Sequence, residues 1–130
     1  MAPGRELEML QKQLQDELDK LKNVQKDYQK ALANRQQLDS QLNENKIVKD
    51  ELDILEDDGK VFKLMGPVLV KQDVEEAKQN VGKRIEYISS ELKRIEDSIK
   101  DLDKKQDTHR ESLSKLQQKF QQAQMKQMTK

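Results

Sequence analysis

Apolar residues recur along the first half of the chain in steps that follow a three-and-four alternation. The series consists of Leu7, Leu10, Leu14, Leu21, Val24, Tyr28, Ala31, Leu38 and Leu42. It forms one apolar stripe along a helix and is typical of the a and d positions of a coiled coil. Arg35 and Asn45 fall on the same stripe as polar exceptions. Because neither Gly nor Pro occurs between Arg5 and Asp58, the pattern predicts an uninterrupted helix over about residues 5–56.

A second stripe occupies the other half of the chain. It begins with Val74, Ala77 and Val81 and continues, after a four-residue stutter, through Ile85, Ile88, Leu92, Ile95, Ile99, Leu102, Gln106, His109, Leu113, Leu116, Phe120 and Ala123. Asp73 stands directly before the stripe, at a place where helix N-caps favour aspartate. The pattern predicts a second helix over about residues 73–127.

The two predicted helices have similar lengths and are separated by a short reversal. We therefore expect them to fold back on one another as an antiparallel two-helix coiled coil, in a mainly α protein. In this register Leu38 lies near Leu92, and Leu10 lies near Phe120.

Both stripes contain an irregularity at the same level of this predicted pairing. The first stripe changes phase after Asn45 and resumes at Val48, Leu52 and Leu55, which is a stammer that overwinds a coiled coil locally. The second stripe has its stutter beside Gly82. A glycine inside a helix costs about 1 kcal/mol relative to alanine, so we expect Gly82 either to permit a bend or a close approach, or to be a tolerated interruption.

A short apolar block, GKVFKLMGPVLVKQD, separates the helices. Two β-prone runs around Gly66-Pro67 predict a hairpin over residues 60–71. Both of its faces carry apolar side chains, an isolated hairpin is marginal in water, and open edges invite further strands. We therefore expect the hairpin to pair with hairpins of other subunits, although it could instead be a connector that packs against its own helices. The predicted assembly residues are Val61, Phe62, Leu64, Met65, Val68, Leu69 and Val70.

Composition narrows the possible classes of protein. Charged residues make up 38% of the 130 residues and aromatic residues 3%, with no Trp, which suits a coiled coil better than a globular core. Lys plus Arg and Asp plus Glu both number 25, so the chain lacks the basic excess that is typical of nucleic-acid-binding proteins. The chain has no Cys, no apolar run of about 18 residues and no apolar signal segment at its start. We expect a cytoplasmic protein with no membrane partner.

Residues suited to catalysis are scarce. His109 is the single histidine, and with Gln106 it is predicted to form a polar layer that fixes helix register rather than a metal site. The carboxylate pairs Glu75-Glu76 and Asp57-Asp58 are expected to serve as capping and solvent-facing groups. No phosphate-binding loop is present. The sequence predicts no active site, no cofactor and no metal.

The hairpin segment VFKLMGPVLVKQ, with ENKIVKDELDIL before it and DVEEAKQNVGKRIEYI after it, resembles the eukaryotic β-type subunits of the prefoldin family. The resemblance extends from Leu7 to about Gln124 and implies one prefoldin domain over residues 1–130. It also implies a heterohexamer with two α-type and three further β-type subunits, whose hairpins join in an intersubunit β-barrel. Prefoldins bind nascent or unfolded proteins, notably actin and tubulin, at the tips of their coiled coils and deliver them to the cytosolic chaperonin without ATP.

By this resemblance, the free end of the arm would bind clients. The candidate client-binding residues are Leu7, Met9, Leu10, Leu14, Phe120, Met125 and Met128. Methionine is flexible and polarizable, which suits surfaces that bind many apolar partners. The three methionines could instead simply close the end of the coiled coil. For the whole chain, the alternatives are a structural coiled-coil scaffold subunit of another complex and a helical arm that binds nucleic acid.

Overall fold

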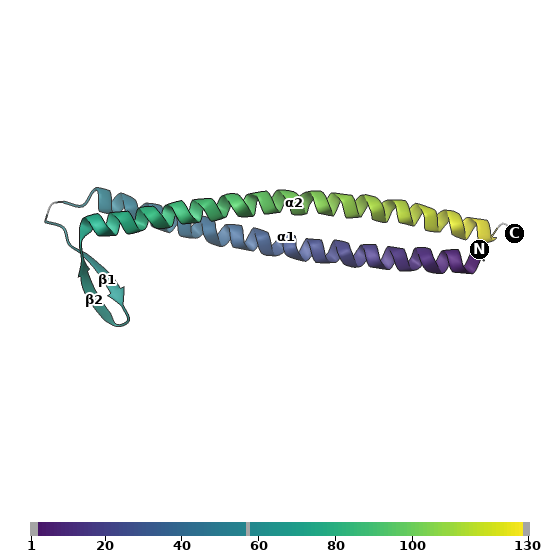
Figure 1. Cartoon of the computed structure of the whole chain (residues 1–130), viewed down its shortest axis with the longest axis horizontal. Coiled ribbons are helices and arrows are strands. Elements are labelled where there is room, and N and C mark those ends of the chain that lie inside the picture. Colours follow the sequence, from purple (N-terminus) through teal and green to yellow (C-terminus); the bar gives the residue numbers. More distant parts are fainter. Residues whose placement is uncertain (1–2, 57, 129–130) are drawn as a thin grey trace. The chain divides into compact units, whose positions relative to one another are not determined.

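The computed structural model describes residues 3–56 and 58–128. In chain order these residues form a long helix, a two-stranded hairpin and a second long helix (Figure 1). The elements are α1 (Pro3–Asp53), β1 (Val61–Met65), β2 (Val68–Gln72) and α2 (Val74–Met128). The predicted class, mainly α with one antiparallel hairpin between the helices, is confirmed.

Helix α1 ends at Asp53, three residues before the predicted limit of 56. Its last turn contains no basic residue, and carboxylates such as Asp53 and Glu56 are unfavourable at the negative end of a helix dipole. The amide of Gly59 then donates to the carbonyl of Glu56 at 2.8 Å. A Cβ atom at Gly59 would lie 2.4 Å from Cγ of Leu55 and 2.9 Å from the Glu56 carbonyl oxygen. Only glycine therefore fits this turn.

The hairpin has a two-residue loop formed by Gly66 and Pro67. Met65 pairs with Val68 across this loop, and Gly66 has a φ of 59°. A positive φ at the first central position followed by proline is typical of a type II′ turn, whose twist suits a hairpin. Pro67 thus lies in the turn and not at the start of β2, which begins one residue later and extends to Gln72.

The register of the hairpin determines its two faces. Residues directly opposite in an antiparallel pair project to the same side. Phe62 pairs with Lys71 and Leu64 pairs with Leu69 on one face. The other face contains the pairs Val61–Gln72, Lys63–Val70 and Met65–Val68. Apolar side chains are therefore present on both faces, as predicted.

Contacts divide the chain into two compact units. The first unit combines residues 1–32 with residues 97–130, of which 3–32 and 97–128 are described. Within it, Gln11 and Leu14 line a groove together with Leu113 and Gln117. The α1 and α2 segments of this unit are therefore antiparallel, in the predicted register. Its buried residues are Leu21, Gln106 and Ala123.

The second unit contains residues 33–96, including the hairpin. Its core is a cluster of Leu52, Ala77 and Val81, against which Val61 and Ile85 pack. Further from the hairpin, Ile88 and Leu92 are also buried. The α2 positions of this core are those that the apolar stripe predicts.

The residues after the phase change of the first stripe differ in burial. Leu52 is buried, whereas Val48 is exposed in a groove beside Leu52 and Leu55 is exposed beyond the end of α1. The side-chain amide of Asn45 donates to the carbonyl of Gln41 at 2.7 Å, within α1. A Cβ atom at Gly82 would meet nothing within 4 Å. The expected close approach at Gly82 is therefore wrong.

Candidate functional site

The hairpin presents a large exposed apolar surface. Six of its seven predicted assembly residues have exposed fractions between 44% and 68%. They are Phe62, Leu64, Met65, Val68, Leu69 and Val70. Contiguous exposed apolar side chains mark interaction sites on soluble proteins.

Val61 differs from the other predicted assembly residues. It is half-buried and packs against Leu52, Ala77 and Val81. Gln72, its partner across the hairpin, is half-buried as well. The base of the hairpin is therefore anchored to its own helices, as in the connector alternative, while the rest of the hairpin remains exposed.

The backbone of the hairpin offers open edges. Within the described residues the sheet has two strands, so each strand pairs on one side and leaves backbone donors and acceptors on the other. Five-residue strands with free edges can accept a further strand from another chain. The apolar faces and the free edges favour β-augmentation at this place.

The predicted client-binding residues gather at one end of the first unit. The start of α1 and the end of α2 lie together there (Figure 1). Four of the residues are half-buried in the helix seam: Leu7, Leu10, Leu14 and Phe120. Met9, Met125 and Met128 are exposed by 50%, 66% and 84%. The structure thus separates seam residues, which hold the helices together, from three methionines that are accessible to a partner.

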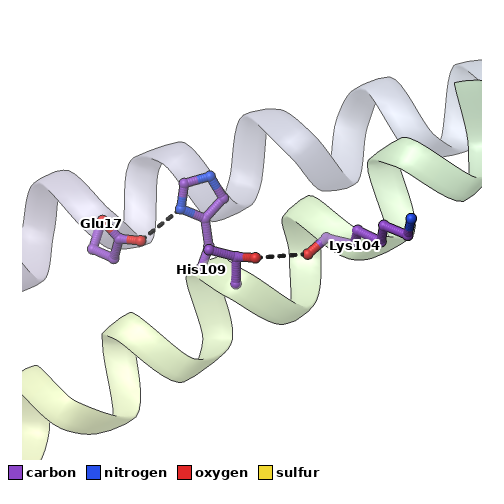
Figure 2. A network of polar contacts seen from close by, with 4 residues as sticks. Glu17, Lys104 and His109 are labelled. Atoms are coloured by element: carbon purple, nitrogen blue, oxygen red, sulfur yellow. Dashed lines mark hydrogen bonds and ion pairs between the residues drawn. The ribbon is translucent and has the colours of Figure 1, made fainter.

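A polar contact crosses the same unit (Figure 2). Nδ1 of His109 lies 2.6 Å from Oε1 of Glu17. A carboxylate only accepts hydrogen bonds, so the imidazole N–H donates to it. The His109 and Glu17 side chains are 23% and 13% exposed, which shields the pair from much of the solvent. Beside His109, the hydroxyl of Thr108 donates to the carbonyl of Lys104 at 3.0 Å (Figure 2).

Gln106 completes this polar layer. Its side chain is buried, and its Oε1 accepts a hydrogen bond from Arg110 at 3.3 Å. The predicted polar layer of Gln106 and His109 is therefore present, but the sequence analysis did not include Glu17. The signal was available, because Glu17 stands three residues after Leu14 and four before Leu21 on the first stripe.

No group of three or more His, Cys, Asp or Glu side chains suited to a metal ion gathers in residues 3–56 and 58–128. His109 contacts Glu17 of the other helix as a hydrogen-bond donor. Asp57, one half of the predicted Asp57-Asp58 pair, lies outside the described residues. In the described parts of the chain, neither long helix contains an apolar stretch that could span a membrane.

The arrangement of two long helices around one hairpin matches known proteins. A family model described as "Prefoldin subunit" matches residues 15–123. The chain belongs to the prefoldin family. Prefoldin subunit 6 of Mus musculus is 50% identical over 117 residues, which cover 90% of this chain and 92% of the mouse protein. A probable prefoldin subunit 6 of Drosophila melanogaster is 54% identical over 112 residues, covering 86% and 90% of the two chains.

A solved prefoldin structure agrees with the fold. The prefoldin beta subunit from Thermococcus strain KS-1 matches with a TM-score of 0.65 and 29% identity, covering 85% of this chain and 91% of that one. The resemblance to β-type prefoldin subunits predicted from the sequence is thereby confirmed. Any proposed function of this prefoldin chain must account for two of its surfaces, the exposed hairpin and the exposed methionines.

Proposed function

We propose that the chain is a subunit of a heterohexameric, cytoplasmic prefoldin complex that binds unfolded proteins and delivers them to the cytosolic chaperonin without ATP. In this complex it joins two α-type and three further β-type subunits. Actin and tubulin chains are the expected clients. The observation that carries the proposal is the hairpin, whose apolar side chains are exposed on both faces.

The hairpin is proposed as the assembly surface, where its strands join an intersubunit β-barrel. Its exposed apolar side chains and free strand edges support this role. Burying a side chain such as Phe62 or Val70 at a subunit contact contributes about 1.5–3 kcal/mol. A structural scaffold needs no such element between its helices.

The first test is assembly with α-type and other β-type prefoldin subunits. The purified chain should form a heterohexamer, measured as native mass, and Phe62→Asp or Val70→Asp should abolish it by burying a charge at the contact. Lys60→Asp, one residue before β1 and already polar and exposed, is the matched control and should assemble. A chain that remains a monomer or dimer in the mixture, or one that assembles despite both Asp variants, would favour the scaffold alternative.

Client binding is proposed at the end of the first unit. Met9, Met125 and Met128 are the exposed apolar side chains there, and flexible thioethers adapt to varied apolar sequences. Changing all three to Gln should lower capture of unfolded actin by the assembled complex, measured as suppression of actin aggregation. Changing Gln11, Gln121 and Gln124 to Asn in the same helix ends is the control. Undiminished capture by the Met variant would indicate that these methionines only close the coiled coil.

A further inference from the structure

The second unit contains a groove of about 440 Å³ that neither proposed surface includes. Gln41 and Asn45 of α1 line one side, and Lys83, Arg84 and Tyr87 of α2 line the other. Buried Ile88 also lines it. Tyr87 is 66% exposed, so its ring is accessible to a partner.

This groove continues into a second one of about 200 Å³ at the base of the hairpin. Arg84 lines both grooves. The second groove is also lined by Val48 of α1 and by Phe62 and Lys63 of β1. One surface therefore runs from Tyr87 to Phe62, which belongs to the proposed assembly hairpin. We call this surface the Arg84 trough.

The trough has a distinctive charge. Its lining residues include the cations Lys63, Lys83 and Arg84 and no carboxylate, although the chain has equal numbers of acidic and basic residues. Within residues 3–56 and 58–128, none of the three cations forms an ion pair. Apolar side chains bordered by unpaired cations fit an apolar partner residue flanked by carboxylates.

The same unit displays that complementary chemistry on its own surface. Ile54 is 80% exposed just after the end of α1, and Glu51, Asp53 and Glu56 stand within three residues of it. A prefoldin subunit of this kind thus carries both a basic apolar trough and an acidic apolar protrusion. In the proposed heterohexamer the side chain that enters the trough belongs to a different subunit, so the Ile54 protrusion serves as an example of such chemistry beside a prefoldin hairpin.

We propose that the Arg84 trough is a second assembly contact, which receives an exposed apolar side chain flanked by carboxylates from the adjacent prefoldin subunit. The occupant is a neighbouring subunit because the trough is continuous with the hairpin surface through Phe62 and Lys63. The inference rests on the proposed hexamer and adds a contact outside the β-barrel. The trough cations determine which neighbour binds, because opposite charges favour one partner and like charges reject another.

The test places a photoreactive benzoyl-phenylalanine at Tyr87 in the full chain, within the assembled complex and without client. Illumination should attach this residue to one neighbouring prefoldin subunit. The same photoreactive residue at exposed Lys93 is the control and should give no such adduct. An adduct at Tyr87 no stronger than that at Lys93, or one that forms only with an added unfolded client, overturns the inference.

Native mass of the same samples separates the two levels of the argument. If no hexamer forms, the proposed function fails and the inference fails with it; if the hexamer forms and Tyr87 gives no subunit adduct, the inference alone fails. A second variant, Lys83→Glu with Arg84→Glu, should raise the concentration of half-dissociation about fivefold near physiological salt. Lys93→Glu should leave it unchanged. Equal dissociation of both variants would contradict the charge argument.

Discussion

Replacing Leu52 with alanine tests how the hairpin is held on its helices. Leu52 is 7% exposed and packs with Ala77, Val81 and Val61. Truncating a buried leucine to alanine costs about 2–5 kcal/mol. Within the described residues no side chain is less than 2% exposed, so the vacated space is close to solvent and can relax. We therefore expect a loss near the lower limit, about 2–3 kcal/mol of the free energy of unfolding.

The assay is urea unfolding of the full chain in dilute solution, followed by helical circular dichroism. Hydrogen exchange adds a local measurement: amides of β1 should exchange faster, because Val61 loses the surface on which it packs. Ile54→Ala is the matched control, since Ile54 is 80% exposed and such a surface change stays within about 0.5 kcal/mol. A cost below about 1 kcal/mol for Leu52→Ala, or unchanged exchange in β1, would refute the assigned packing.

Further variants probe the polar layer and two of the glycines. His109→Leu removes the partner of the shielded Glu17 carboxylate and should lower the free energy of unfolding by about 1–3 kcal/mol. Changing both Glu17 and His109 to Leu should recover that loss. Thermal unfolding measures both variants, and equal stabilities would contradict the pairing. Gly82→Ala should raise stability by about 0.5–1 kcal/mol, because the helix gains propensity and the Cβ has room. Gly66→Ala should instead lower it by about 1–2 kcal/mol, because its φ of 59° is left-handed. Opposite signs in the same unfolding assay are the expected result.

Helices and hairpin could be predicted closely because their signals are local. Apolar periodicity and the few Gly and Pro residues located both helices, and the helix limits differ from prediction by at most three residues. The largest difference is at Asp53, where the unfavourable charge at the helix end acts in addition to periodicity. Gly66-Pro67 indicated the hairpin, since few dipeptides suit its turn.

The packing at the phase change could not be predicted in the same way. A stammer signals that the stripe rotates, but its direction depends on both helices together. Leu52 remained in the core, whereas Val48 lies exposed in a groove beside it and Leu55 falls beyond the end of α1. The period-two alternation in β1 likewise predicts which side chains share a face, but it does not predict which face packs against the helices. The packing of Val61 was therefore not predicted. Glu17 was missed for a simpler reason, because a carboxylate on an apolar stripe was not counted as part of it.

The exposed hairpin has a consequence for the amount of this protein in a cell. The hairpin of a free copy carries six apolar side chains in water and strand edges that accept other chains. Such a copy is prone to aggregate, and exposed apolar segments are what chaperones and proteases use to remove unfinished proteins. If the hairpin is the assembly surface, copies that find their partners hide this segment and surplus copies are left open to clearance. The dosage of the subunit would then follow the supply of its partners, through the same few residues that join them.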